Sequence, residues 1–270
     1  MRIRSGICAV LTLLWGVPSA LAQTQPSGPA NQPSPKDAIE LREANDRLII
    51  SSPVPVVLEL FTSQGCSSCP PADELFATYA QRRNVIALSF PVDYWDHLGW
   101  RDTLAGPRNT ARQRAYAKAL GIGNVYTPQM VINGATQAVG SKPYAIEKAI
   151  ARTMIDPALA VRVRAHEDGS RTIIEIGARD KANGEPSCTV WLIKLSPRVG
   201  VEIKRGENRG KKMEYVNVVR EISPIGMWSG KQMRIELPSG VVNEPGHRSA
   251  VLVQTGDMGR IIGASWLGRQ

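Results

Sequence analysis

The sequence predicts an α/β domain followed by a β-rich, sandwich-like domain. Up to about residue 154, short apolar runs rich in β-branched residues alternate with segments of helical period. Such alternation is typical of α/β proteins. From Ala158 onward, runs of alternating apolar and polar residues are separated by turn signals at regular spacing, which is typical of antiparallel β-structure. We therefore place the first domain at 36–156 and the second at 158–270.

A pair of cysteines at C-x-x-C spacing narrows the fold class of the first domain. An apolar strand-like run ends at the Gly65 turn, and Cys66 and Cys69 follow at the start of a helical segment. Strand, turn, C-x-x-C and helix in this order predict a thioredoxin-like redox site. A zinc half-site is the weaker interpretation, because the sequence has no second C-x-x-C and no H-x-x-x-H.

The N-terminus predicts export. Residues 1–22 combine Arg2 and Arg4 with a short apolar stretch and end in the cleavage signal Ala20-Leu21-Ala22, as a signal peptide does. Residues 23–35 are rich in Pro, Gln, Ser and Gly and predict a flexible linker. We expect a periplasmic or secreted protein with no stable membrane span after cleavage, in a compartment where disulfides persist.

The elements of the first domain follow from local signals. The strand at 54–61 is apolar on both faces, which suits a central strand covered by helices. Pro107 lies near the start of a helix and Gly121 just past its end, while Asn133-Gly134 predicts a hairpin turn. The resulting order is the core order of a thioredoxin fold. The expected elements are a short helix at 36–47, strand 54–61, helix 71–83, strand 85–90, helix 107–120, strands 130–132 and 136–139, and helix 143–154.

The second domain is predicted from strands alone. Glu167-Asp168-Gly169 is a hairpin signature between two alternating runs. The region shows no nucleophile–base pair, phosphate loop or metal cluster, so we expect it to bind or position something. Its expected strands are 159–165, 171–178, 188–195, 199–204, 214–222, 232–237 and 250–254.

The composition is that of a globular protein, and the distribution of basic residues does not indicate a nucleic-acid partner. The 270 residues are 43% hydrophobic and 21% charged, as in ordinary globular proteins. The formal charge is +9, but the densest basic cluster, at 204–212, is interrupted by Glu207 and two glycines. No nucleic-acid motif accompanies it, so a solvated basic surface is expected and no nucleic-acid partner.

Cys188, in a strand of the second domain, is expected to be a buried inert residue.

The dithiol carries the predicted chemistry. Cys66 comes first and is expected to be the more exposed sulfur and the nucleophile, with Cys69 one helical turn on to resolve a mixed disulfide. A helix start lowers the pKa of a cysteine thiol. Asp73 and Glu74, in the following turn, oppose that effect. A permanent structural disulfide is the alternative interpretation.

Two further segments are expected near the dithiol. Thr127-Pro128 precedes a strand and a hairpin, the place of a cis-proline in thioredoxin-like folds, where Thr127 would offer its backbone to a bound peptide. Tyr94 and Trp95 belong to an aromatic loop that either lines a peptide groove or closes the core. His97, in the same loop, is expected to be an ordinary surface histidine.

Glu59 interrupts an otherwise apolar strand seven residues before Cys66. A buried carboxyl beneath the dithiol would have a raised pKa and would act as a general base for the resolving thiol. Equally, Glu59 is a strand glutamate bonded to backbone or to an arginine. The sequence leaves both interpretations open.

Several long motifs carry a resemblance to a known family. They are residues 61–73, 92–96 with 98–100, 110–116, 126–130, 207–210 and 218–220. In these motifs the chain resembles a domain-of-unknown-function family of secreted, thioredoxin-like bacterial proteins. The resemblance implies a thioredoxin-like domain followed by a β-rich one and supplies no substrate. Pro91 departs from the family pattern, which has a histidine before Val-Asp-Tyr-Trp-Asp.

We therefore expect an exported thiol-disulfide oxidoreductase that acts on protein or small-thiol substrates with an unknown redox partner. Its expected residues are Cys66, Cys69, Pro128 and Glu59 for catalysis, with Thr127, Tyr94 and Trp95 for substrate binding. No cofactor and no resident metal are expected. Two alternatives use the same cysteines: a Cu(I) or soft-metal delivery protein, and a non-catalytic binding module with a fixed disulfide.

Overall fold

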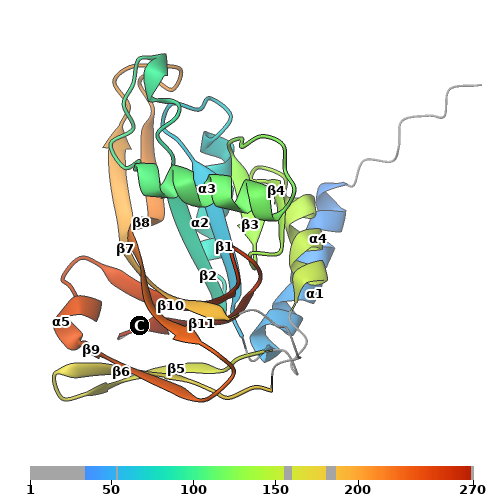
Figure 1. The fold of residues 1–270 in the computed structure, drawn as a ribbon. Helices are drawn as coiled ribbons and strands as arrows, with labels where there is room; N and C mark the ends of the chain where they lie inside the picture. Colours follow the sequence, from blue (N-terminus) through green and yellow to red (C-terminus); the bar gives the residue numbers. More distant parts are fainter. Residues whose placement is uncertain (1–33, 53, 155–159, 181–186, 269–270) are drawn as a thin grey trace, which may run out of the picture. The chain divides into compact units, whose positions relative to one another are not determined.

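The computed structural model describes residues 34–52, 54–154, 160–180 and 187–268 (Figure 1). The expected signal peptide and most of the expected linker lie outside these residues. The expected boundary between two domains also lies outside them, at 155–159. The described segments on both sides of it belong to one compact unit, so the boundary does not divide two compact units.

The N-terminal half of the described chain has the expected order of elements, and most boundaries agree within two residues. Two helices are exceptions. Helix α1 is longer than expected and begins at a capping box formed by Ser34 and Asp37, and the helix expected at 71–83 ends three residues early, at Ala80. The elements are α1 (Pro35–Ser51), β1 (Val56–Thr62), α2 (Pro70–Ala80), β2 (Val85–Pro91), the short 3-10 helix η1 (Asp96–Leu98), α3 (Pro107–Ala119), β3 (Gln129–Ile132), β4 (Thr136–Val139) and α4 (Pro143–Thr153).

The C-terminal half differs from expectation in five elements. The strands expected at 159–165 and 214–222 end later, at Asp168 and Trp228, and residue 159 lies outside the described residues. The two strands expected at 188–195 and 199–204 form one strand, β7, that continues through Pro197. Pairing of β7 with β10 ends at Leu195, so Pro197 faces an open edge where its missing N–H breaks no ladder bond. A short helix and a last strand, at 239–242 and 261–267, were not expected. The elements are β5 (Val163–Asp168), β6 (Arg171–Ile176), β7 (Cys188–Glu202), β8 (Lys212–Trp228), β9 (Met233–Pro238), α5 (Ser239–Val242), β10 (Arg248–Thr255) and β11 (Ile261–Leu267).

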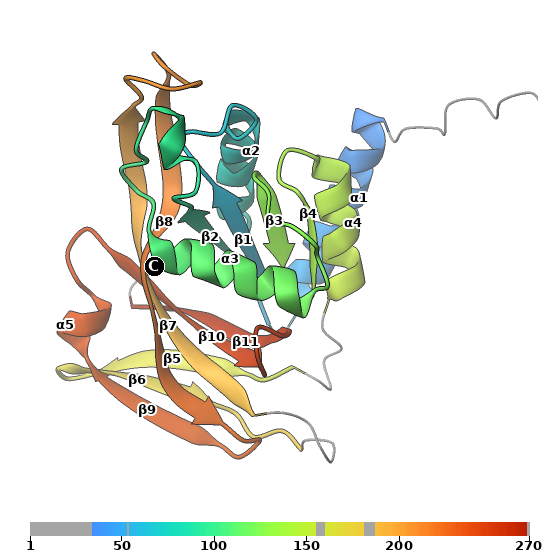
Figure 2. The same ribbon diagram turned by 45° about the horizontal axis from the view of Figure 1, so that its top comes forward.

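A single eight-stranded sheet runs through both halves, in the order β11-β10-β7-β8-β2-β1-β3-β4. Strands β1 and β2 are parallel, whereas β3 and β4 add to β1 as an antiparallel hairpin. A second sheet has the order β5-β6-β9. Figures 1 and 2 show the long β7–β8 hairpin running from the second sheet to the far end of the molecule.

Both faces of β1 are buried, as the apolar run predicts. Val56, Leu58 and Leu60 pack with residues of α1, α2 and α4, while Val57 and Phe61 face α3 and strands β7, β10 and β11. Figure 2 shows α3 crossing one side of the sheet with α2 behind it. The β-rich half therefore completes the core of the α/β half.

The second sheet packs on the far end of the first. Ile174 and Ile176 of β6 share a buried cluster with Val190 of β7 and with Val251 and Val253 of β10. The β-rich half is thus two-layered, but one of its layers belongs to the common sheet. No helix among the described residues has the length and hydrophobicity needed to cross a membrane.

The two halves of the large sheet join at one point. Strands β2 and β8 are parallel there and share only the register pair Ser89 and Val218. Beside this pair, the buried side chain of Asn217 donates a hydrogen bond of 3.0 Å to the carbonyl oxygen of Ala87. Asn217 has a positive φ of 50°, which asparagine tolerates better than most residues.

We expect Asn217→Ala to lower the free energy of unfolding by about 1–3 kcal/mol, because it leaves the buried Ala87 carbonyl unpaired. Asn217→Gly should lose the same hydrogen bond while accommodating the positive φ, so it should be the less damaging variant. Urea unfolding measures both. Asn243→Ala is the matched control: its hydrogen bond to Glu167 is exposed, so its effect should stay within about 0.5 kcal/mol. Equal effects of Asn217→Ala and the control would contradict this account of the joint.

Candidate functional site

The site is built on the turn between β1 and α2. Cys66 and Cys69 form a disulfide with their Cα atoms 5.4 Å apart. Cys69 is the N-cap of α2, and the first two helical positions are Pro70 and Pro71, where a missing N–H breaks no helical bond. The carbonyl oxygen of Cys69 accepts the N–H groups of Ala72 and Asp73, at 2.8 and 3.0 Å. The expected position of the cysteine pair at a helix start is confirmed.

Both cysteines are buried. Cys66 is 1% exposed and Cys69 is 0% exposed, so the expected difference in exposure between the two cysteines is almost absent and neither is open to solvent. The two intervening serines are exposed, and the Ser68 hydroxyl lies 3.4 Å from the Cys66 sulfur. The turn thus presents its serines to solvent and its sulfurs to the interior, because two segments distant in sequence cover it.

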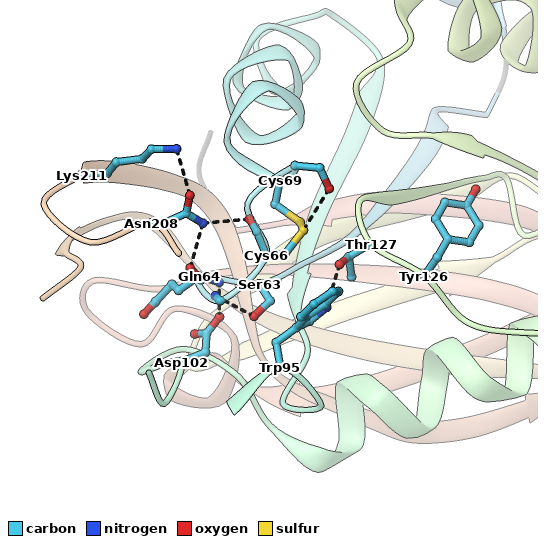
Figure 3. The surroundings of a disulfide bond; sticks show 12 residues. Ser63, Gln64, Cys66, Cys69, Trp95, Asp102, Tyr126, Thr127, Asn208 and Lys211 are labelled. Carbon is cyan, nitrogen blue, oxygen red and sulfur yellow. Dashed lines mark hydrogen bonds between the residues drawn. A yellow bond between two sulfur atoms is a disulfide. The ribbon is translucent and has the colours of Figure 1, made fainter. Parts of the chain in front are cut away.

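The first covering segment is the aromatic loop after β2. Trp95 lies so close to the turn that a Cβ added at Gly65 would come within 3.0 Å of the Trp95 Cβ. The Trp95 indole N–H donates to the Thr127 hydroxyl at 2.8 Å (Figure 3). Tyr94 is half-buried, and burial raises the pKa of its hydroxyl. Of the two expected aromatic residues, Trp95 bridges the cysteine turn and Thr127.

Thr127 and Pro128 lie beside the disulfide, as the sequence predicts. The peptide bond between them is cis, and both residues are buried. The Pro128 carbonyl accepts the N–H of Gly140 at 2.9 Å. A Cβ at Gly140 would lie 3.2 Å from both Ala72 of α2 and Pro128, which places the proline loop against the first turn of α2.

Gln64 and Asp102 fix the backbone just before the cysteines. The Gln64 N–H donates to one Asp102 carboxylate oxygen at 2.8 Å, and the Trp100 indole N–H donates to the Gln64 side chain at 2.8 Å. Burial raises the pKa of Asp102, and backbone N–H groups from Gln64, Leu104 and Ala105 oppose that shift. Sequence reasoning missed this pair, since 38 residues separate its members.

The second covering segment is the tip of the β7–β8 hairpin. The buried Asn208 amide donates to the carbonyl oxygens of Gln64 and Cys66, at 3.0 and 2.8 Å. Lys211 donates in turn to the Asn208 side-chain oxygen at 2.9 Å (Figure 3). Asn208 stood inside a motif of the sequence, but nothing local related it to cysteines 142 residues earlier.

Glu59 is not placed as a proton acceptor for Cys69. Its carboxylate forms a 2.7 Å ion pair with the buried Arg112, and its other oxygen accepts the Tyr116 hydroxyl. Arg112 and Tyr116 also contact Gln254 of β10. The structural interpretation of Glu59, a strand carboxylate bonded to an arginine, is the one that the geometry fits.

A second carboxyl group near the disulfide, that of Asp73, is buried, although no pattern in the sequence indicated its burial. It lies one helical turn after Cys69, is 4% exposed, and has one carboxyl oxygen without a hydrogen-bond partner in the part of the chain that the structure describes. Burial raises the pKa of Asp73 to about 8, and the nearby Thr62 side chain opposes that shift. Asp73 is therefore mostly neutral at pH 7.

Two other candidate residues, His97 and Cys188, do not belong to the group of residues around the disulfide. His97 is exposed and contacts the Tyr94 carbonyl, as expected of a surface histidine. Cys188 is fully buried in β7. Within the described ranges, no group of three or more His, Cys, Asp or Glu residues is arranged to hold a metal ion.

Comparisons with known proteins identify the family. Residues 57–254 match the model of a family described as a protein of unknown function, DUF1223. This chain belongs to the DUF1223 family. No curated protein matches it.

Two solved structures resemble this DUF1223 protein. The protein AGR_C_4864 from Agrobacterium tumefaciens is 38% identical, with a TM-score of 0.70 over 80% of this chain and 96% of that one. HBP35 of Porphyromonas gingivalis is 17% identical, with a TM-score of 0.57 over 80% of this chain and 75% of that one. The second likeness concerns the fold alone.

The buried Asp73 predicts a pH-dependent stability. An unfolded aspartate has a pKa of about 3.9, whereas the folded one keeps its proton up to about pH 8. Between these values the unfolded chain binds fewer protons than the folded one, so the free energy of unfolding falls as pH rises. Asp73→Asn removes this contribution, which amounts to at most about 1.4 kcal/mol per pH unit.

Urea unfolding between pH 5 and pH 8 measures the effect. The stability of Asp73→Asn relative to the unsubstituted protein should rise steadily across that range. Asp168→Asn, at an exposed position, is the control and should give a flat difference. A flat difference for Asp73→Asn as well would show that Asp73 is ionised in the folded protein.

Proposed function

We propose that this DUF1223 protein is an exported thiol-disulfide oxidoreductase that cycles the Cys66–Cys69 pair against protein or small-thiol substrates. The observation that carries the proposal is the disulfide itself, which lies in the turn between β1 and α2 with Cys69 as the helix N-cap. A helix N-terminus stabilises a thiolate, which is the species that leaves when such a disulfide opens.

The arrangement around the disulfide supports a thioredoxin-like fold for residues 56–153. Strands follow the order β2-β1-β3-β4 with β1 and β2 parallel, and helices cover both faces. The Thr127–Pro128 loop lies against the first turn of α2. We include Thr127, Pro128 and Trp95 in the proposed substrate groove, with Tyr94 at its edge.

In the proposed exchange, the Cys66–Cys69 disulfide oxidises two substrate thiols. A substrate thiolate attacks the Cys66 sulfur, the bond between Cys66 and Cys69 breaks, and Cys69 leaves as a thiolate that takes up a proton. A second substrate thiolate attacks the substrate sulfur of the mixed disulfide, which releases Cys66 as a thiolate. Two substrate thiols become one disulfide, and the protein gains two electrons and two protons.

Because the disulfide is buried, a local opening step must precede exchange. Cys66 is 1% exposed, so a substrate thiolate reaches its sulfur only when Trp95 or the hairpin tip moves. Local openings of this kind need less free energy than global unfolding. Export from the cytoplasm, inferred from residues 1–22, would supply the oxidising surroundings that the cycle uses.

A second candidate is favoured by the burial of both sulfurs. A non-catalytic module with a structural disulfide would also bury its sulfur atoms, and it would need no opening step. The two candidates differ in how the bond is reduced under native conditions.

We expect dithiothreitol to reduce the Cys66–Cys69 bond at least about tenfold faster than the chain unfolds globally, because local opening suffices. Alkylation followed by mass spectrometry measures reduction, and denaturant-jump kinetics measures unfolding. The reduced Cys69→Ser variant should then capture 2-hydroxyethyl disulfide as a stable mixed disulfide at Cys66. The matched Cys66→Ser variant should capture it more slowly, because the Ser68 hydroxyl lies 3.4 Å from the Cys66 sulfur and can stabilise a thiolate there. Reduction at the unfolding rate would establish the structural disulfide instead.

A further inference from the structure

The tip of the β7–β8 hairpin, residues 203–212, is strongly basic. It carries five basic side chains and one acidic one, Glu207. All five basic side chains are exposed, and none forms an ion pair with another residue of the described ranges. The five are Lys204, Arg205, Arg209, Lys211 and Lys212.

This tip is fixed against the disulfide turn. Asn208, at its centre, is hydrogen-bonded to the Cys66 carbonyl, and Gly206 lies against Trp100, where an added Cβ would come within 3.1 Å of the Trp100 Cβ. Figure 3 shows Lys211 and Asn208 on the side of the disulfide opposite Thr127. The basic cluster is therefore part of the rim of the proposed redox site.

A cleft of about 430 Å³ opens between the tip and the start of α2. Its floor includes Ser67 and Pro70 from the cysteine turn, and its opposite wall is Lys211, Lys212 and Met213. Glu74 also lines it and contributes one negative charge. A chain that enters this cleft passes from the basic tip directly to the exposed serines between the two cysteines.

Five like charges on one loop repel one another and attract anions. Within the described ranges, no acidic side chain forms an ion pair with any of the five, although other exposed basic residues are paired, such as Arg198 with Glu214 on the same hairpin. We therefore expect a partner to supply the complementary negative charge. The five basic residues extend over positions 204–212 of the loop, so a partner with several carboxylates matches them better than one small anion.

We propose that the hairpin tip recognises an acidic polypeptide segment whose cysteine exchanges with the Cys66–Cys69 disulfide. This inference rests on the proposed function. The Lys211 ammonium group has three N–H donors, so it can bind a carboxylate of the partner while it keeps its hydrogen bond to the Asn208 side chain beside Cys66.

The exchange uses the thiols of the partner. The thiolate of one acidic segment attacks the Cys66 sulfur, and Cys69 leaves as a thiolate that is protonated by water. The thiolate of a second segment attacks the partner sulfur of this mixed disulfide, so Cys66 is released and the two segments become disulfide-linked.

The test compares three synthetic peptides of equal length, each with one central cysteine flanked by aspartate, glutamine or lysine. Rates of reduction of the native full-length protein are measured at low salt and divided by the thiolate concentration of each peptide. Reaction of each peptide with 2-hydroxyethyl disulfide corrects for intrinsic reactivity. We expect the aspartate peptide to react at least about tenfold faster than the lysine peptide, and high salt to abolish the difference.

Two triple variants locate the effect. Arg205→Gln with Arg209→Gln and Lys212→Gln should bring the ratio of aspartate to lysine peptide rates close to one. Lys118→Gln with Lys148→Gln and Lys231→Gln removes the same charge from exposed positions outside the tip and should leave the ratio unchanged.

The outcomes separate the inference from the proposed function. Equal rates for the three peptides, with dithiothreitol reducing the disulfide readily, would overturn the acidic partner and leave the oxidoreductase standing. Failure of dithiothreitol as well as all peptides to reduce the native protein would overturn both. If 2-mercaptoethanesulfonate is favoured over cysteamine as strongly as the aspartate peptide is over the lysine peptide, a small anionic thiol is the partner and the polypeptide is excluded.

Discussion

The shared sheet and the disulfide site both depend on how one long β-hairpin, β7–β8, attaches to the α/β half. The β7–β8 hairpin carries two asparagines, one in its tip and one in β8, whose amide groups bond to backbone carbonyls on the other side of the join. Asn217 bonds to Ala87 in the middle of β2, and Asn208 bonds to Cys66 at the disulfide. Backbone carbonyls buried at such a join need donors, and these two side chains supply them. The hairpin thereby extends the sheet at one end and closes the site at the other.

The site follows from this attachment. A turn with two cysteines at a helix start would by itself leave its first sulfur at the surface, as the sequence leads one to expect. Here the hairpin tip and Trp95 bury both sulfurs and leave the serines between them exposed. The same contact that encloses the disulfide also brings a cluster of exposed basic residues to its rim. Enclosure and charge at the site therefore have one structural origin, because both come from the same loop.

The buried acids show how tertiary contacts assign roles to similar residues. Glu59 and Asp73 are both carboxylates near the cysteines in sequence, and both are buried. Glu59 forms an ion pair with Arg112, whereas no ion pair to Asp73 forms within the described part of the chain, and burial raises the pKa of Asp73 to about 8. A carboxyl group in an apolar interior stays charged only when a partner offsets the loss of hydration. The arginine that decides between the two lies 53 residues from Glu59.

Local signals in the sequence were enough to predict several elements of this protein. The apolar run at β1, the proline and glycine signals around α3, and the Asn133-Gly134 turn each depend on neighbours along the chain, and the corresponding elements lie where they were expected. The C-x-x-C spacing and the Thr127-Pro128 pair likewise predicted the disulfide turn and the loop beside it. Three outcomes come instead from packing between distant segments: the two halves share one sheet, β7 continues past Pro197, and the sulfurs are enclosed. The continuation of β7 depends on its pairing with β8, and the enclosure depends on Trp95 and on contacts as remote in sequence as that of Asn208 with Cys66. Periodicity and spacing along the chain contain no signal for such contacts.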